Sequence, residues 1–166
     1  MKYAIALGSN LGDRKHNLKA AMLRIADFAI IKRVSSIYET KALVPHGAPQ
    51  SWDLNFYNAV ILIELQPKRS PLQLLCKLKA IEKSLGRSTN YIKWAPRVID
   101  LDIILAEQAL AGEQLTIPHP QFMRRDFVLT PLLEILCDKY AKLFSIDIKQ
   151  LKQAVPVQNI IRKLND

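Results

Sequence analysis

The chain carries, from position 97 to position 105, the stretch Arg97-Val-Ile-Asp-Leu-Asp-Ile-Ile-Leu105. Its odd positions from Ile99 onward are all apolar, and two of the even positions between them are aspartates. Because side chains alternate along a β-strand, Asp100 and Asp102 are expected to point the same way, roughly 6.6 Å apart. The pattern predicts a strand with one buried face and a pair of carboxylates on the other.

Two like charges on one strand face need an explanation. Aspartate is depleted in strands, and the repulsion between the two carboxylates is about 2.5 kcal/mol at an effective dielectric constant near 20. A cation removes this conflict, and Mg²⁺ is usually held by one or two carboxylates together with water and substrate phosphates. The alternative is a solvated strand face whose acids pair with Arg97 or Lys93. Spacing alone leaves both interpretations open.

Hydrophobic periodicity predicts the elements on either side of this stretch. Strands are expected over residues 2–7, 30–40 with a break near Ser35, and 56–65, and helices over about 18–28 and 71–85. The order is β-α-β-β-α-β, the ferredoxin-like α+β arrangement of an antiparallel sheet with two helices on one face. We expect its first and last strands to lie side by side at the centre of the sheet.

Residues beyond about 110 are expected to extend this core. A short strand over 115–117, a helix over about 131–136 and further helices near the C-terminus give a three-layer α/β/α architecture. The loops 41–55 and 86–96 are long and poorly patterned, so we expect them to be mobile and to close over bound ligands.

Length and composition favour one domain over residues 1–166, because 166 residues that are 49% hydrophobic can bury a sizeable core. No apolar run approaches the ~18 residues that span a bilayer, and the first residues lack the apolar length of a secretory signal, so we expect a cytoplasmic protein without a membrane partner. Cys76 and Cys137 show no metal-ligand spacing and are expected to be buried, reduced thiols.

The net charge of +9 favours anionic partners such as nucleic acid, nucleotide or polyphosphate. Arg87, Lys93 and Arg97 lead into the two aspartates, and Arg124 and Arg125 follow a Pro-His-Pro segment. Cations beside a carboxylate-bound metal are what a transferring phosphoryl group requires. Ordinary solvated surface charge is the competing explanation for each of them.

Other candidate features are less specific taken singly. The turn from Gly8 to Asp13 lacks the GK[ST] ending of a phosphate-binding loop and is expected to be a strand-to-helix turn. Four aromatic residues could stack on a flat ring or belong to the core: Phe56, Tyr57, Trp94 and Phe127. A single histidine between prolines, His119, is more often structural than catalytic.

Taken together, these segments form a specific combination. In chain order they are Ala6-Leu-Gly-Ser-Asn-Leu-Gly12, Phe56-Tyr-Asn-Ala-Val60, Gly86-Arg87, Trp94-Ala-Pro-Arg-Val-Ile-Asp-Leu-Asp-Ile-Ile-Leu105, Ile117-Pro-His-Pro120 and Arg125-Asp-Phe-Val-Leu129. From residue 2 to about residue 137 the sequence resembles the 6-hydroxymethyl-7,8-dihydropterin pyrophosphokinase family. The resemblance implies an ATP- and Mg²⁺-dependent transferase of folate biosynthesis, which moves pyrophosphate from ATP to the hydroxymethyl group of the pterin and releases AMP.

The resemblance also implies residue roles. Two Mg²⁺ ions are expected on Asp100 and Asp102, and catalysis is expected to involve these residues together with Arg87 and Arg97. ATP contacts are expected from Glu82, Lys93, His119 and Arg125. The pterin is expected to contact Thr40, Leu43, Phe56, Asn58, Trp94 and Phe127. The chain departs from the family pattern at Thr89, Lys93, Pro120 and Asp126, and its 41–55 loop is longer than in compact members.

Two rival functions remain at this level. A basic ferredoxin-like module could bind nucleic acid, but the K/R-G-F/Y-G/A-F-V-x-F/Y stretch of RNA-recognition domains is missing and two aspartates occupy the would-be binding face. A metal-dependent phosphohydrolase would use the acids but leave Asn58 and the aromatic residues without a role. We therefore expect ATP and hydroxymethyldihydropterin as ligands of a monomer that binds no nucleic acid.

Overall fold

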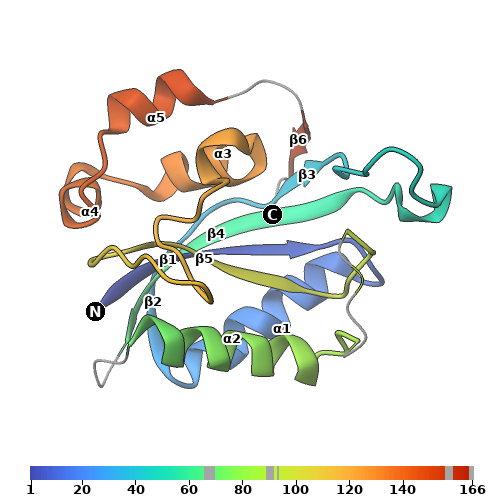
Figure 1. Cartoon of the computed structure of the whole chain (residues 1–166), viewed down its shortest axis with the longest axis horizontal. Helices are drawn as coiled ribbons and strands as arrows, with labels where there is room; N and C mark the ends of the chain where they lie inside the picture. The colour runs from blue at the N-terminus through green and yellow to red at the C-terminus, as the bar shows by residue number, and fades with distance from the viewer. Residues whose placement is uncertain (66–69, 89–91, 93, 156–158, 165–166) are drawn as a thin grey trace.

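The computed structural model describes residues 1–65, 70–88, 92, 94–155 and 159–164 (Figure 1). Its strands are β1 (Lys2–Ser9), β2 (Ala29–Val34), β3 (Tyr38–Thr40), β4 (Phe56–Leu65), β5 (Asp100–Ala106) and β6 (Ile160–Lys163). Its α-helices are α1 (Arg14–Ala26), α2 (Pro71–Ser84), α3 (Asp126–Ile135), α4 (Asp138–Leu143) and α5 (Ile148–Ala154). Two short 3₁₀ helices, η1 (Gln50–Trp52) and η2 (Phe122–Arg124), complete the described elements.

Within the described residues the strands form one antiparallel sheet of six strands in the order β5-β1-β4-β3-β6. β2 and β3 pair with successive parts of β4, on the edge opposite β1. The predicted β-α-β-β-α-β core and its antiparallel sheet are confirmed. The first and last core strands, β1 and β5, do lie side by side, but β5 is at the edge of the sheet and the central pair is β1 and β4.

The sheet separates two layers of helices, as expected (Figure 1). Helices α1 and α2 pack on one face through Leu18, Ile25, Leu74 and Leu78, and α3, α4 and α5 cover the other face through Leu129, Leu132, Ala141 and Leu151. Strand β5 contributes to both cores, with Leu101 and Ile103 in the first and Ile104 in the second. Since side chains alternate, Asp100 and Asp102 share the face of Ile104, towards α3.

Helix α2 starts at a capping box and ends beside the edge strand. The Ser70 hydroxyl accepts from the Gln73 N–H at 3.2 Å, and the Gln73 side chain accepts from the Ser70 N–H at 3.0 Å. At the other end of the helix, Glu82 accepts the Leu101 N–H at 2.7 Å, and Lys79 donates to the Leu101 carbonyl at 3.3 Å. These two side chains cover the open edge of β5, which would otherwise present unpaired backbone groups.

The structure differs from the sequence expectations mainly after residue 106. In place of a strand over 115–117 there is a single bridge between Leu110 and Ile117, α3 begins at Asp126 rather than near 131, and β6 adds a strand that periodicity did not indicate. Cys76 is exposed and Cys137 half-buried, so the expectation of buried thiols is wrong. Among the described residues, no helix has the length and apolar content needed to cross a membrane.

Candidate active site

The two aspartates of β5 lie at the meeting point of two hollows in the surface. One hollow, which we call the aromatic slot, is lined by apolar and aromatic side chains that include Phe56, Trp94 and Phe127, together with Asn58 and Thr40. The other, the polar hollow, is lined by Lys79, Glu82, Arg87 and His119. Five residues line both: Trp94, Arg97, Asp100, Asp102 and Arg125. Measured out to open solvent, the slot holds about 740 Å³ and the polar hollow about 940 Å³.

Asp100 is held by two arginines. Arg87 Nη1 donates to its Oδ1 atom at 2.7 Å, and Arg97 Nε lies 3.4 Å from its Oδ2 atom. Within the described part of the chain, Arg97 Nε is the buried side-chain nitrogen or oxygen that makes no hydrogen bond. A buried donor without an acceptor is costly, so this nitrogen is suited to receive an oxygen from an anionic ligand.

Asp102 is more open and has a weaker cationic neighbour. Its side chain is 35% exposed, against 22% for Asp100, and Lys79 Nζ is 4.0 Å from its Oδ1 atom. Burial and the adjacent Asp100 carboxylate raise the pKa of Asp102, and the charges of Lys79, His119 and Arg125 only partly oppose this. The repulsion between the two carboxylates is therefore only partly offset by these cations, and a bound metal ion would reduce it further.

Glu82 organises the cations at the end of α2. Its side chain is 2% exposed, and its two oxygens contact Lys79 Nζ at 2.9 Å and Arg87 Nη1 at 2.7 Å, in addition to the Leu101 N–H. Burial raises the pKa of Glu82 despite these partners. Arg87 thus bridges Glu82 and Asp100, and Glu82 acts in the described structure through Arg87 and β5.

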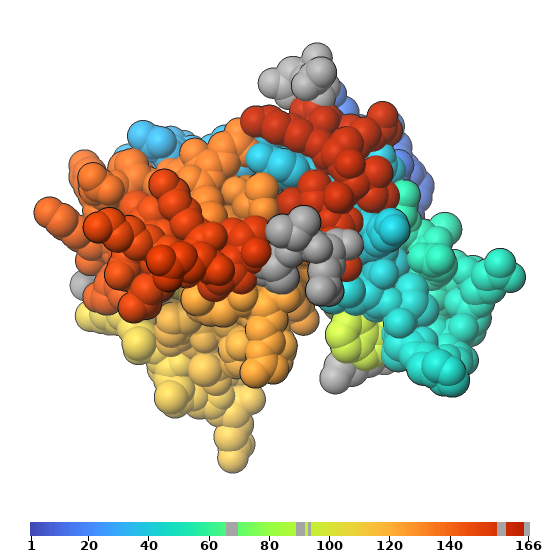
Figure 2. Space-filling view, turned by 90° about the horizontal axis from the view of Figure 1, so that it is seen from above, coloured from blue at the N-terminus to red at the C-terminus, as the bar shows by residue number. Residues whose placement is uncertain are grey.

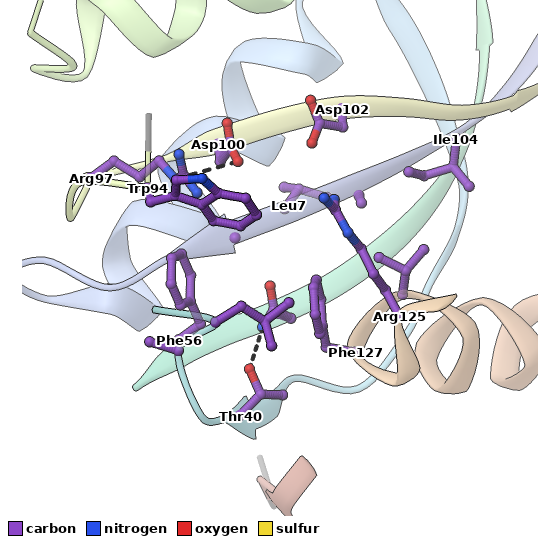
Figure 3. Close-up of a pocket in the computed structure, with 16 residues that line it drawn as sticks. Leu7, Thr40, Phe56, Trp94, Arg97, Asp100, Asp102, Ile104, Arg125 and Phe127 are labelled. Carbon is purple, nitrogen blue, oxygen red and sulfur yellow. Dashed lines mark hydrogen bonds and ion pairs between the residues drawn. The ribbon is translucent and has the colours of Figure 1, made fainter. Parts of the chain in front are cut away.

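The aromatic slot has the shape of a site for a flat ring (Figure 3). Phe56 at the start of β4 and Phe127 at the start of α3 stand on opposite sides of it, with Thr40 below. Asn58 Nδ2 donates to Thr40 Oγ1 at 2.7 Å. Arg97 lies 5.6 Å from the centre of the Phe56 ring, and Arg125 lies 5.8 Å from that of Phe127. A planar heterocycle could stack between the rings with its edge towards the Asn58 amide.

Leu43 and Trp94 line the mouth of the slot, and Trp94 is 37% exposed with a backbone φ of 74°. His119 lines the polar hollow and Arg125 lines both hollows, and Figure 3 shows Arg125 reaching from the start of α3 towards Asp102. Burial lowers the pKa of His119, and the Arg125 charge adds to this while the Asp102 carboxylate opposes it. Its Nδ1 atom accepts the Gln121 N–H at 3.1 Å.

The structure thus brings together every predicted site residue that it describes. Lys93, and Thr89 among the departures, lie outside the described residues. For a metal, the donor set is two carboxylates on one strand face, and the described residues contain no cluster of three or more potential ligands. Two carboxylates facing a cation-lined hollow fit Mg²⁺, which takes its other ligands from water and phosphate oxygens.

Sequence reasoning assigned no role to three residues that shape the site. Lys79 reaches the polar hollow from the same helix as Glu82. It lies four residues before Lys83, and this spacing does not indicate that it belongs to the site. Asn10 fixes the segment before β5 through two hydrogen bonds to Arg97. The side-chain oxygen of Asn10 accepts the Arg97 backbone N–H at 2.7 Å, and the backbone N–H of Asn10 donates to the Arg97 carbonyl at 3.2 Å. Gly8 lies opposite Asn58 in the β1–β4 pairing. Of these three residues, only Asn10 and Gly8 could have been found from the sequence, because both lie in the Ala6–Gly12 segment that supports the family resemblance.

Comparisons with known proteins agree with this arrangement. The family model described as "7,8-dihydro-6-hydroxymethylpterin-pyrophosphokinase (HPPK)" matches residues 4–137. The chain is similar to the 2-amino-4-hydroxy-6-hydroxymethyldihydropteridine pyrophosphokinases of Aquifex aeolicus, with 34% identity over 89% of this chain and 88% of the relative, and of Bacillus subtilis, with 40% identity over 83% and 79%.

Longer relatives contain a similar segment. The folate synthesis bifunctional protein of Chlamydia caviae is 41% identical over 80% of this chain, and the chain spans only 30% of that protein's length. Among solved structures, an HPPK-DHPS in complex with substrates aligns with 92% of this chain and 43% of its own at a TM-score of 0.62. A Plasmodium falciparum HPPK-DHPS aligns with 92% and 44% at 0.65. At 16% and 15% identity these two structures support the fold alone.

Proposed function

Because the chain belongs to the 7,8-dihydro-6-hydroxymethylpterin-pyrophosphokinase family, we propose that it transfers the β,γ-pyrophosphoryl group of ATP to 6-hydroxymethyl-7,8-dihydropterin in folate biosynthesis. In this reaction the hydroxymethyl oxygen bonds to the β-phosphorus and loses its proton. The bond from the β-phosphorus to the oxygen shared with the α-phosphate breaks, so that AMP leaves.

One observation carries the proposal. Asp100 and Asp102 line both the aromatic slot and the polar hollow, so the boundary between a ring-binding site and a cation-lined site runs through the carboxylate pair. A two-substrate transferase needs this layout, because the acceptor hydroxyl and the triphosphate must meet at one point. A phosphohydrolase would need the polar hollow only, and a nucleic-acid-binding module would not need an aromatic slot beside a carboxylate pair.

The carboxylate pair is proposed to hold two Mg²⁺ ions together with the triphosphate. When bound, such ions lower the pKa of the attacking hydroxyl and neutralise charge that develops on the phosphate oxygens. Arg87 and Arg97, which both contact Asp100, are placed to move their guanidinium groups onto phosphate oxygens, where bidentate contacts orient the leaving group. His119 and Arg125 are assigned to the nucleotide. Glu82 is assigned to it indirectly, through its ion pair with Arg87. The contact of Lys93 with ATP stays a prediction.

The pterin is assigned to the aromatic slot. Phe56 and Phe127 supply stacking surfaces on both sides of the ring, and Asn58, oriented by Thr40, supplies the polar edge that distinguishes a heterocycle from a hydrocarbon. Leu43 and Trp94 are assigned to the mouth of the slot, where they would exclude water from the reacting oxygen.

The test is direct. The purified chain, incubated with Mg²⁺, ATP and 6-hydroxymethyl-7,8-dihydropterin, is expected to form AMP and dihydropterin diphosphate in equal amounts. The matched control is 6-methyl-7,8-dihydropterin, which lacks the acceptor oxygen and should give no AMP. Release of inorganic phosphate that is independent of the pterin would favour the phosphohydrolase instead. The single domain over 1–166, the monomeric state and the cytoplasmic location stay predictions.

A further inference from the structure

Asp126 is a buried carboxylate that the proposed reaction does not use. It is 1% exposed and lies between two residues that line the slot, Arg125 and Phe127. Its Oδ1 atom accepts hydrogen bonds from the Phe127 N–H and the Asn159 side-chain amide, both at 2.9 Å. Its Oδ2 atom accepts from the backbone N–H groups of Asn159 at 2.6 Å and Ile160 at 3.1 Å. All four donors belong either to the first turn of α3 or to the start of β6.

The same short segment is bonded on its other side to β3. The Asn159 carbonyl accepts the Lys41 N–H at 2.9 Å, and Ile160 is paired with Thr40. Further along the strands, Arg162 Nε donates to Glu39 Oε2 at 2.8 Å. Figure 2 shows the C-terminal strand, in red, lying between the orange of the α3 region and the light blue of the β3 region.

Asn159 and Ile160 therefore connect the two walls of the slot. One wall carries Thr40, which orients Asn58, and the other carries Phe127, which faces Phe56. Strand β6 lies beyond residues 4–137, the part of the chain that the family model matches. Asp126 and the start of β6 thus form a hydrogen-bonded connection between these walls.

We propose that Asp126 is a positioning residue, which, through β6, sets the distance between Phe127 and Thr40 and so determines affinity for the pterin. The proposal rests on the proposed function, because it assigns the slot to that ligand. A charged acceptor that satisfies four donors from two elements holds them more rigidly than packing alone. Losing it should leave the slot formed but wider. The polar hollow should be affected less, because among its lining residues only Arg125 adjoins Asp126 in the chain.

The experiment compares Asp126→Ala and Asp126→Asn with the parent chain. Asn keeps one acceptor oxygen and the size of the side chain, so it separates the loss of charge from the loss of volume. Asp147→Asn is the matched control, because Asp147 caps α5 by accepting the Lys149 N–H at 2.8 Å and lies outside both hollows. Pterin binding is measured by calorimetry with 6-hydroxymethylpterin in the presence of Mg²⁺ and α,β-methylene-ATP, and nucleotide binding with the analogue alone.

Because misplacement of a site by about 1 Å can cost two powers of ten, the Kd for the pterin is expected to rise at least about tenfold in Asp126→Ala and by a smaller factor in Asp126→Asn. The Kd for the nucleotide analogue should rise by a clearly smaller factor than the Kd for the pterin, and Asp147→Asn should change neither. In turnover, the KM for the pterin should rise more than kcat falls, a split that general destabilisation would not produce.

Equal changes in both affinities, or an unchanged pterin affinity in Asp126→Ala, would overturn the proposal. If Asp126→Ala does not fold, as judged by circular dichroism, the same criteria applied to Asp126→Asn decide. A parent chain that binds no pterin would overturn the proposed function, whereas a parent that binds it beside an unaffected Asp126→Ala would overturn only the positioning role.

Discussion

Arg87 Nη1 lies 2.7 Å from Asp100 Oδ1, so a residue just beyond α2 reaches across to the first residue of β5. Gly86, whose φ is 99°, makes the turn that redirects the chain at the end of the helix. The contact joins a cation to a carboxylate that we assign to metal binding. Arg87 therefore lies where it can exchange this carboxylate for a phosphate oxygen when nucleotide and Mg²⁺ are bound.

The first prediction concerns the carboxylates. Asp100→Ala and Asp102→Ala are each expected to lower kcat/KM by at least about 10³-fold, because charge stabilisation through bound metal is the main resource in phosphoryl transfer. The thermal midpoint should change little in Asp102→Ala, which removes a like-charge repulsion, and should fall in Asp100→Ala, which also removes the ion pairs with Arg87 and Arg97. Steady-state AMP formation measures the effect, and Glu113→Ala, on an exposed turn, is the control. Turnover near that of the parent in either variant at saturating Mg²⁺ would contradict the metal assignment.

The second prediction concerns Glu82. Glu82→Gln removes the buried charge that holds Lys79 and Arg87, so we expect a loss of about 2 to 3 kcal/mol in the free energy of unfolding. Activity should fall as well, because Arg87 loses its ion pair with the Glu82 carboxylate. Chemical denaturation and AMP formation are the measurements, with Glu113→Gln as the exposed control. A variant as stable and as active as the parent would show that Glu82 is dispensable.

The third prediction concerns Tyr38, whose hydroxyl donates to Glu134 at 3.0 Å. Burial and this carboxylate raise the pKa of Tyr38 to about 12. A group whose pKa is raised on folding stabilises the protein below its unfolded pKa, about 10, and loses that contribution as the pH rises through its folded pKa. The thermal midpoint should therefore fall between about pH 10 and pH 12, and the fall should be smaller in Tyr38→Phe.

Ultraviolet absorbance of tyrosinate gives an independent measurement. Removing Tyr38 should delete one step centred near pH 12, although burial also raises the pKa of Tyr3 to about 12, so one step of that kind should remain. Tyr3→Phe provides the matched control, because Tyr3 belongs to the core beneath α1 and α2, whereas Glu134 is on α3. A Tyr38 step near the ordinary value of 10 would mean that its hydroxyl is solvated.

The sequence predicted the core order because each core element has a clear local pattern. A continuous apolar run marks β4, the alternation of aspartates with apolar residues marks the start of β5, and the Ser70-Pro71 start marks α2. β6 was missed because Ile160–Lys163 is short and largely exposed, and it becomes a strand only by pairing with β3, more than a hundred residues earlier. Such pairing is set by tertiary contacts, which a local pattern does not encode.

The candidate site shows the same division. Asp100 and Asp102 were predicted from the alternation of polar and apolar residues alone, because side chains alternate between the two faces of a strand. Lys79 and Asn10 were not, since Lys79 reaches Asp102 only after α2 docks on the edge of β5, and Asn10 meets Arg97 only after the two segments have folded together. Asp126 was noted as a departure from the family pattern, but its four hydrogen bonds depend on β6.

The last prediction concerns Gly8, which lies opposite Asn58 in the sheet. A Cβ atom at Gly8 would come within 2.9 Å of Asn58 Oδ1 and 3.5 Å of Phe56 Cδ1. The first distance is shorter than side chains tolerate, so the Asn58 amide must move away from its hydrogen bond to Thr40. In Gly8→Ala we expect the KM for the pterin to rise about tenfold or more and the KM for ATP to stay within about twofold, because unpaired polar groups in a site strongly oppose binding.

The double variant Gly8→Ala/Asn58→Ala tests the route of the effect. If Gly8 acts by leaving room for the Asn58 amide, the double variant should bind the pterin no more weakly than Asn58→Ala alone, since the two changes remove the same interaction. Gly112→Ala is the matched control, because a Cβ atom there would be an ordinary 3.5 Å from the Leu115 carbonyl in an exposed turn. Additive losses in the double variant would instead show that Gly8 acts independently of the Asn58 amide.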